Sequence, residues 1–235
     1  MQRTIAALFI ALILVLLVAG CGGGGSTSTP ETAAYLPLAI GNEWHYQYNE
    51  YTQPASVRAR GAMLRHHSGL APASKVQSKD LEAEDVVQIT GIQQIGGAQW
   101  YSAVAQYVGG EPADPIYLRH IAQGLQRKDA LSDPAFYMIR TPIEVGTTWT
   151  VFFGSGSATY HEDFIITSVG QTVSVPAGTY DNCIVIENIF QQAGQPDDVI
   201  TYWYSPGVGQ VREERHLGNN LVYQLQLLDP PTLVE

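Results

Sequence analysis

The chain has 235 residues, of which 45% are hydrophobic, and its 22 acidic against 12 basic side chains give a formal net charge of −10. A chain of this length can bury a core without disulfides, and its size suits one all-β domain or two small ones. Because Lys and Arg are few, the composition argues against a nucleic-acid partner and against binding to anionic lipids through a polybasic segment. We interpret the excess of acidic residues as favouring solubility.

The N-terminus has the pattern of an export signal. Arg3 precedes an unbroken apolar run over residues 5–18, which is the length of a signal-peptide core and short for a bilayer span. The run ends in Val18-Ala19-Gly20-Cys21, which resembles the bacterial lipobox. The resemblance implies a signal peptide at 1–20, cleavage before Cys21, and acyl chains on that cysteine. The alternative is an ordinary signal peptide followed by a chance cysteine.

Lipidation of Cys21 would make the membrane the first partner, because several acyl chains on one residue give stable anchoring. Gly22 rather than Asp follows the cysteine. In diderm bacteria this resemblance implies sorting to the outer membrane, so we expect a lipid-anchored protein of the cell envelope.

Residues 21–34 are rich in Gly, Ser and Thr, and we expect a flexible tether without secondary structure. A β domain is expected over 35–235. If Cys21 is lipidated, Cys183 stands alone in an oxidising compartment. Because Ile184-Val185-Ile186 follows it, we predict a buried small hydrophobe rather than a nucleophile.

Alternation of aromatic and polar residues predicts a half-buried strand at Trp44, Tyr46 and Tyr48. Gly96-Gly97 fits a two-residue hairpin turn. Ser132-Asp133-Pro134 is a helix-start signal and predicts one short helix. Further strands are expected at 56–66, 86–95, 99–108 and 116–122, with a loop at 67–79.

The spacing P-x-x-x-G-x-x-W occurs twice, at residues 37–44 and 142–149. Apolar positions inside the two copies also match, since Ile40 corresponds to Val145. We interpret this repeated spacing, which we call the echo, as a loop that leads into a strand and occurs once in each of two structurally similar halves. The alternative is a chance match.

The strongest strand signal lies in Val175 to Val211, where two proline-glycine turns bracket β-branched and aromatic runs. Strands are also expected at 162–169, 171–175, 210–216 and 220–228. About ten strands with little helix and no linker-like break predict one antiparallel all-β domain.

Three motifs support a likeness: YLPLAIGNEWHY at 35–46, PAGTYDNC at 176–183 and YSPGVGQV at 204–211. With them the chain resembles uncharacterised bacterial envelope lipoproteins and, more loosely, the LolA/LolB class. That likeness implies a single strongly curved antiparallel sheet, or half-open barrel, around an apolar cavity.

The polar residues show no clear catalytic pattern, and we expect neither a catalytic centre, a metal nor a cofactor. His161 and Asp163 would share a strand face, but a solvated strand end explains them. Glu213 and Arg215 resemble a solvated charge ladder, and Asp197-Asp198 falls in a polar connection.

Aromatic side chains on strands remain as candidates to face a ligand, although they can equally fill a core. The candidate ligand-facing residues are Trp44, Tyr46, Tyr48, Trp100, Trp149 and Trp203. We therefore expect a non-catalytic module that binds an apolar ligand such as a lipid or acyl chain. The alternatives are a structural or protein-interaction module of the envelope and, more remotely, a hydrolase with a polar cluster around His161 or His120.

Overall fold

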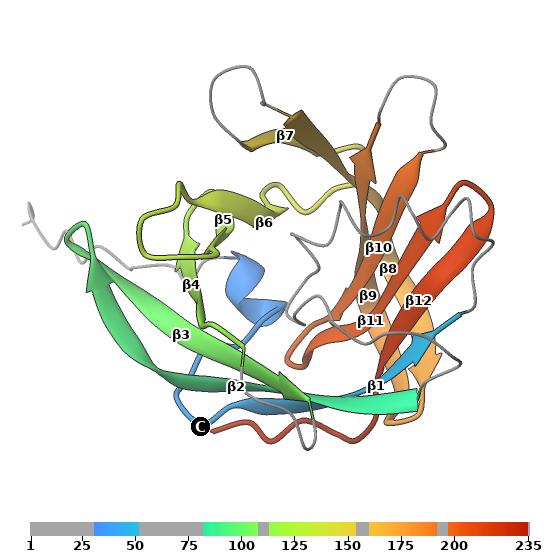
Figure 1. Ribbon diagram of the computed structural model, residues 1–235, viewed down its shortest axis with the longest axis horizontal. Helices are drawn as coiled ribbons and strands as arrows, with labels where there is room; N and C mark the ends of the chain where they lie inside the picture. The colour runs from blue at the N-terminus through green and yellow to red at the C-terminus, as the bar shows by residue number, and fades with distance from the viewer. Residues whose placement is uncertain (1–30, 52–81, 108–112, 154–159, 192–196, 235) are drawn as a thin grey trace, which may run out of the picture.

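The computed structural model describes residues 31–51, 82–107, 113–153, 160–191 and 197–234 (Figure 1). These residues form one short 3₁₀ helix, η1 (Glu31–Ala34), and twelve strands. The strands are β1 (Glu43–Glu50), β2 (Glu82–Ile95), β3 (Ala98–Tyr107), β4 (Ile116–Ile121), β5 (Gly124–Lys128), β6 (Phe136–Arg140), β7 (Thr148–Phe153), β8 (Tyr160–Val175), β9 (Gly178–Phe190), β10 (Asp198–Ser205), β11 (Gly209–Leu217) and β12 (Asn220–Leu227).

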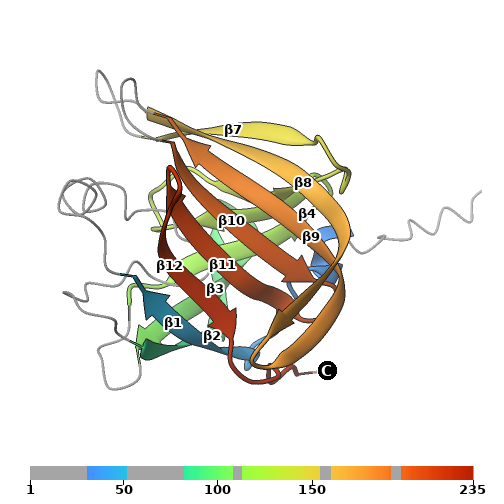
Figure 2. The same ribbon diagram turned by 90° about the vertical axis from the view of Figure 1, so that its right-hand side faces the viewer.

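All twelve strands belong to one antiparallel sheet with the order β6-β5-β4-β3-β2-β1-β12-β11-β10-β9-β8-β7. Neighbours in the sheet are neighbours in the chain, except where β1 pairs with β12. The sheet curls into a barrel that is nearly closed, and its seam lies between β6 and β7 (Figures 1 and 2). The expected all-β, strongly curved, half-open barrel is therefore confirmed.

Several local expectations need correction. The helix predicted at Ser132-Asp133-Pro134 is absent, and residues 129–135 form turns and bends between β5 and β6. Residues 162–175 form one strand, not two, because Gly170 takes a positive φ of 83° at a bulge and the ladder continues past it. The predicted strand at 56–66 and loop at 67–79 lie outside the described residues.

The two copies of the P-x-x-x-G-x-x-W spacing open two six-stranded halves, β1–β6 and β7–β12. Gly41 and Gly146 have φ of 96° and 92°, and the N–H of each donates at 2.8 Å to an isoleucine carbonyl, Ile89 or Ile166. The ladder shifts register just after each of these isoleucines. The echo therefore marks two structurally similar halves, as the sequence indicated.

The residue after each glycine closes the loop in the same way. The Asn42 amide donates to the Pro37 carbonyl at 3.0 Å, and the Thr147 hydroxyl donates to the Pro142 carbonyl at 2.9 Å. The tryptophan of each copy then donates its indole N–H to a backbone carbonyl in the opposite half of the chain. Because β1 and β7 are six strands apart in either direction, the two loops lie on opposite sides of one barrel end.

The barrel has two different ends, which we call proximal and distal (Figure 2). The proximal end carries residues 35–42, 96–97, 122–123, 141–147, 176–177, 206–208 and the tail 228–234. The distal end carries residues 129–135 and 218–219, together with the strand ends that flank 52–81, 108–112, 154–159 and 192–196.

Helix η1 lies inside the ring of strands (Figure 1), although residues 31–34 were expected to be part of a tether without secondary structure; its bond to Gly207 places it at the proximal end. Thr32 and Leu36 are fully buried, and the Gly207 N–H donates to the Ala34 carbonyl. His120 of β4 donates through Nε2 to the Leu36 carbonyl at 2.8 Å, which leaves Nδ1 to accept from the Thr32 hydroxyl at 3.0 Å. Burial of these groups is what orders the segment.

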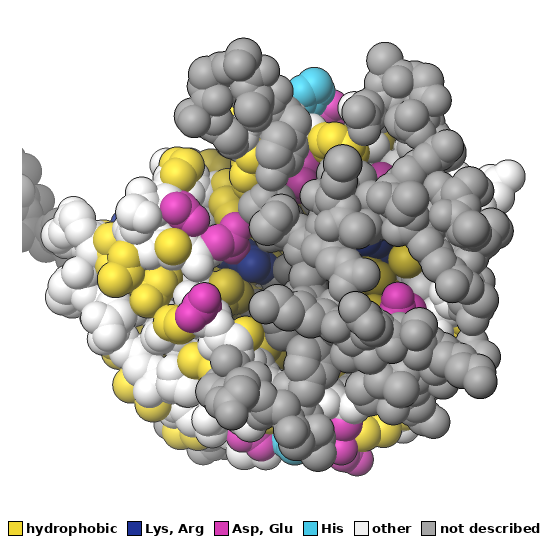
Figure 3. All heavy atoms as spheres, viewed as in Figure 1, with side chains coloured by type: hydrophobic (Ala, Val, Ile, Leu, Met, Phe, Trp, Pro, Cys, Tyr) yellow, Lys and Arg dark blue, Asp and Glu magenta, His cyan; other side chains and the backbone are white. Residues whose placement is uncertain are grey.

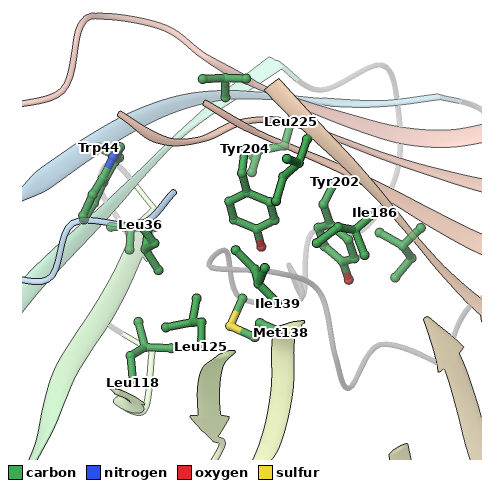
Figure 4. Packing of buried hydrophobic residues seen from close by; sticks show 14 of the residues in the cluster. Leu36, Trp44, Leu118, Leu125, Met138, Ile139, Ile186, Tyr202, Tyr204 and Leu225 are labelled. Atoms are coloured by element: carbon green, nitrogen blue, oxygen red, sulfur yellow. The ribbon is translucent and has the colours of Figure 1, made fainter. Parts of the chain in front are cut away.

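Apolar side chains from both halves fill the proximal part of the barrel. Figure 4 shows labelled residues pointing toward one another from strands on opposite sides. Leu36, Trp44, Leu118, Leu125, Ile139, Ile186, Tyr204 and Leu225 are all fully buried or nearly so. This part of the interior is a packed core.

Candidate functional site

Four of the six candidate aromatic residues lie on the inner face of the barrel and already have structural partners. Trp44 donates to the Val208 carbonyl at 2.6 Å, Tyr46 to the Gln210 carbonyl at 2.9 Å, and Trp149 to the Tyr137 carbonyl at 2.9 Å. Trp149 also stacks on Phe164 at 5.2 Å, and Tyr48 packs against Tyr223 at 5.5 Å. These rings bridge strands within the core; whether any also contacts a ligand stays a prediction.

Trp100 and Trp203 lie on the outer face instead. The Arg119 guanidinium lies 4.2 Å from the Trp100 ring centre and Lys128 Nζ lies 5.8 Å from it. Arg212 covers Trp203 at 5.0 Å. Sequence alternation alone could not place these two residues, because β3 and β10 each carry aromatic side chains on both faces. Neither faces the barrel interior.

The distal part of the interior is lined by charged side chains, which the sequence pattern does not predict. Each lies at an inward position of its strand and is at least nine-tenths buried. They are Asp85, Arg127, Glu162, Asp198, Glu213 and Arg215. We call these six residues the distal polar layer.

The expected solvated ladder at Glu213 and Arg215 is therefore wrong, and Asp198 is not in a polar connection. Arg215 donates from Nε and Nη2 to the two carboxylate oxygens of Asp198, at 2.9 and 2.6 Å. This two-point pair joins β11 to β10 inside the barrel. The alternating charges of β11 look solvated in sequence, but one of the two faces points inward.

Glu213 lies at the centre of the layer. It accepts from the Tyr223 hydroxyl at 2.6 Å and from the Gln210 amide at 2.9 Å. Burial, and then the Glu213 charge, raise the pKa values of Tyr204 and Tyr223. These tyrosines therefore stay neutral and can act as hydroxyl donors in a water-poor site.

Asp85 is the least satisfied member of the layer. It is 1% exposed, and among the described residues neither carboxylate oxygen has a hydrogen-bond partner. Burial, with a further contribution from the Glu213 charge, raises its pKa to about 7. A buried carboxyl that titrates near neutrality is the kind of group that marks functional sites.

A small pocket lies beside the layer, lined by Glu162, Asn188, Phe190, Asp198 and Ile200. The Asn188 amide donates to Glu162 at 2.8 Å, while its side-chain carbonyl oxygen is buried and has no partner in the part of the chain that the structure describes. The pocket has room for about one water molecule, which could donate to that oxygen. The layer is therefore polar and close to filled in this region.

The histidines noted in the sequence as possible catalytic residues do not lie in the distal polar layer. His161 lies 3.7 Å from Asp163, and both side chains are more than half exposed on the outer face. His120 is at the proximal end, where burial lowers its pKa and the bond to Leu36 partly opposes that effect. The hydrolase alternative would need these residues to converge with other polar groups, and they lie in different places. His66 and His67 lie outside the described residues.

Cys183 is buried, and burial raises the pKa of its thiol, with a partly opposing hydrogen bond to Ser205. Its predicted role as a small buried hydrophobe is confirmed. In the described ranges no helix is both long and apolar enough to cross a membrane. Within the same ranges no three His, Cys, Asp or Glu side chains gather as a metal site. Cys21 lies outside them.

Together these features define a class: an up-and-down antiparallel barrel with a packed proximal core and a polar inner layer at its distal end. No protein-family model and no curated protein matches the chain. Among solved structures it is similar to a candidate lipoprotein of Parabacteroides distasonis ATCC 8503, at 15% identity and a TM-score of 0.44, over 84% of this chain and 98% of that one.

It is also similar to a candidate exported protein of Bacteroides fragilis NCTC 9343, described as having a YmcC-like fold. That match has 12% identity and a TM-score of 0.44, and covers 85% of this chain and 99% of the other. Likenesses this distant carry no information on function. The resemblance to the LolA/LolB class stays an interpretation, and among the described residues there is no helix beyond η1 that could form a lid.

Proposed function

We propose that this chain is a lipid-anchored protein of the bacterial cell envelope whose barrel is a non-catalytic binding module. The signal-like segment 1–20 and Cys21 support anchoring. The burial of Thr32 and Leu36 supports a short connection, because the chain joins the barrel only ten residues or so after the anchor. Sorting to the outer membrane follows from Gly22 and belongs to the same proposal.

The ligand is held at the distal end of the interior, and the unpartnered Asp85 carboxylate is the observation that carries this step. An ionised group taken out of water costs several kcal/mol unless it gains partners. A bare acyl chain supplies none, and the proximal interior is already filled by side chains. The distal polar layer therefore favours a ligand with polar or cationic groups; if that ligand is a lipid, its head group is the part that contacts the layer.

Native mass spectrometry of the full-length protein, extracted from its own membranes in mild detergent, tests the proposal. We expect a non-covalent adduct in addition to the mass of the lipidated chain, and loss of most of that adduct in Asp85→Asn. Asp114→Asn, at an exposed position, is the matched control. A chain that carries acyl groups but no adduct in any preparation would contradict ligand binding and leave the anchor intact.

A second candidate function is a protein-interaction module, and the seam favours it. Strand β6 pairs only with β5, and β7 pairs only with β8, within the part of the chain that the structure describes. Phe152 on β7 is exposed at its outer face. Unpaired strand edges of this kind can accept an extended segment of a partner.

A photo-crosslinking amino acid at position 152, in cells that carry the lipidated protein, tests this second function. We expect one dominant crosslinked envelope protein. The same reporter at Val169, which is exposed on β8 beyond the residues that pair with β7, is the control. Equal crosslinking from both positions would contradict a specific role for the seam.

A further inference from the structure

We propose that the proximal end of the barrel rests on the lipid bilayer, with Ile40, Val145 and Val234 as its contact side chains. The barrel axis then stands along the membrane normal and the distal polar layer faces away from the membrane. This inference rests on the proposed anchoring through Cys21 and adds to it the surface that meets the lipid.

The point at which the chain enters the barrel is the first argument. Helix η1 begins at Glu31, and Thr32 and Leu36 are locked inside the proximal end by His120 and Gly207. About ten residues separate Cys21 from Glu31, which span on the order of 18 Å as a flexible coil and at most about 35 Å when extended. The proximal end is therefore the part of the barrel that is held close to the acyl chains.

The second argument is the set of apolar side chains on that end. Ile40 is 51% exposed and Val145 is 66% exposed. They occupy matching positions in the two repeated loops, which lie on opposite sides of the barrel end. A flat surface that touches both must lie across the barrel axis in the direction that joins the two loops, which limits the tilt of the molecule in that direction.

Val234 adds a third point to this surface. It is 50% exposed and lies against Gly41 of the first loop. The tail that carries it is held in place, since the Val234 N–H donates to the Asn42 side-chain oxygen at 2.7 Å and Thr232 pairs with Glu43. The three side chains are thus presented by ordered backbone.

The negative charge of the chain shows that contact with the bilayer depends on its apolar interior and not on the charge of its lipid head groups. The net charge is −10, and Glu31, Glu43, Glu144 and Asp229 belong to the proximal end. Anionic lipid would repel these groups, so contact depends on apolar insertion. Three small side chains would bind a bilayer weakly on their own, but the anchor holds them at a high effective concentration. Figure 3 looks onto the opposite, distal end, where acidic side chains are spread over the described surface.

The test uses the full-length lipidated protein in phosphatidylcholine vesicles. An environment-sensitive fluorophore is attached through Val145→Cys, and in a separate protein through Phe152→Cys at the distal end; Cys183 is buried and does not compete for label. Lipids with a quencher near the head group are then added. We expect quenching at position 145 to exceed that at 152 at least threefold.

A second variant shows whether the apolar side chains produce this orientation. Ile40→Ser together with Val234→Ser, in the chain labelled at 145, should lower the quenching at least twofold while the protein still floats with the vesicles. Vesicles with added phosphatidylglycerol should not increase it. Equal quenching at 145 and 152 in a protein that floats would overturn this inference alone. A full-length protein that does not float at all would overturn the anchoring, and this inference with it.

Discussion

Asp85 links the stability of the barrel to pH. Burial and the nearby Glu213 raise its pKa from 3.8 to about 7. A carboxyl with a higher pKa in the folded chain holds its proton more tightly there, so the folded state loses stability as pH rises from about 4 through about 7. The loss is at most on the order of 4 kcal/mol.

We therefore expect Asp85→Asn to unfold at higher urea concentration than the natural chain at about pH 8, by roughly 1–3 kcal/mol, and to differ little at about pH 4.5. Asp114→Asn, which removes an exposed carboxylate, should show no such pH-dependent gain. Greater destabilisation of Asp85→Asn at the higher pH would contradict an ionised, unpartnered carboxylate.

The Arg215–Asp198 pair makes a second prediction at the scale of the residue. Both side chains are at least nine-tenths buried and bonded at two points, so removing one partner leaves a buried charge. We expect Asp198→Asn to cost about 3–5 kcal/mol in urea unfolding, and Asp198→Leu with Arg215→Met to recover most of it.

The control for these substitutions is an ion pair on the opposite face of the same strand, β11. Arg212 and Glu214 form an ion pair on the outer face of β11, where their side chains are 28% and 13% exposed, against 6% and 5% for Arg215 and Asp198, so water screens these charges more than the inner ones. Glu214→Gln should cost about 1 kcal/mol or less. If the inner and outer substitutions cost the same, the inner pair is more hydrated than its burial indicates.

Among the elements, the two repeated loops allow a matched comparison. Gly41 and Gly146 both have positive φ near 90°, so an alanine is strained at either position. A Cβ at Gly146 would meet open space, whereas a Cβ at Gly41 would lie 3.1 Å from Val234. We expect Gly146→Ala to cost about 1–2 kcal/mol in urea unfolding, from backbone strain alone.

Gly41→Ala should cost more than Gly146→Ala by the energy needed to move Val234. Val234→Ala removes the side chain that a Cβ at position 41 would meet. In that background, Gly41→Ala should cost about as much stability as Gly146→Ala does in the natural chain. A smaller effect at Gly41 than at Gly146 would show that the two loops do not bear equivalent strain.

Elements with regular alternation could be predicted from the sequence, and others could not. Strands β1 and β12 alternate large apolar with polar residues, and both were expected; the inner face of β1 is the predicted one, with Trp44, Tyr46 and Tyr48. Strands β5 and β6 have five residues each, too few for a periodic signal, and Arg127 occupies an inward position. The repeated loop was visible because its glycine and tryptophan have fixed roles.

The candidate site could not be predicted for a physical reason. Alternation shows which residues share a face, but it does not show which face is inside when both carry charge. Glu213 and Arg215 alternate with Arg212 and Glu214, and only the closed sheet decides that the first two are buried. The neighbours of Asp85 in the layer come from strands far apart in the sequence, so no local spacing reveals them.

At the scale of the whole molecule, the position of the seam sets how the two halves depend on each other. Strands β1 and β12 pair from Tyr46–Leu227 to Glu50–Tyr223, and η1 and Trp44 of the first half bond to Gly207 and Val208 of the second. Across the seam, by contrast, the described contacts all involve side chains. The Trp149 indole N–H donates to the Tyr137 carbonyl, and the Phe136 ring packs against the Phe153 ring. A break in the chain between Arg140 and Thr141 would therefore sever no strand pairing.

We expect fragments 1–140 and 141–235 to be unfolded alone, because each exposes half of one shared core, and to regain the β-sheet circular dichroism of the intact chain when mixed. The complex should have a Kd in the micromolar range or tighter, measured by titration in detergent. Trp44→Phe deletes the indole N–H that reaches Val208 and replaces a fully buried indole by a smaller ring, so it should weaken association at least 5- to 10-fold. Trp203→Phe, on the outer face, is the control and should leave association unchanged. Cooperative unfolding of either fragment by itself would contradict a single core built jointly by the two halves.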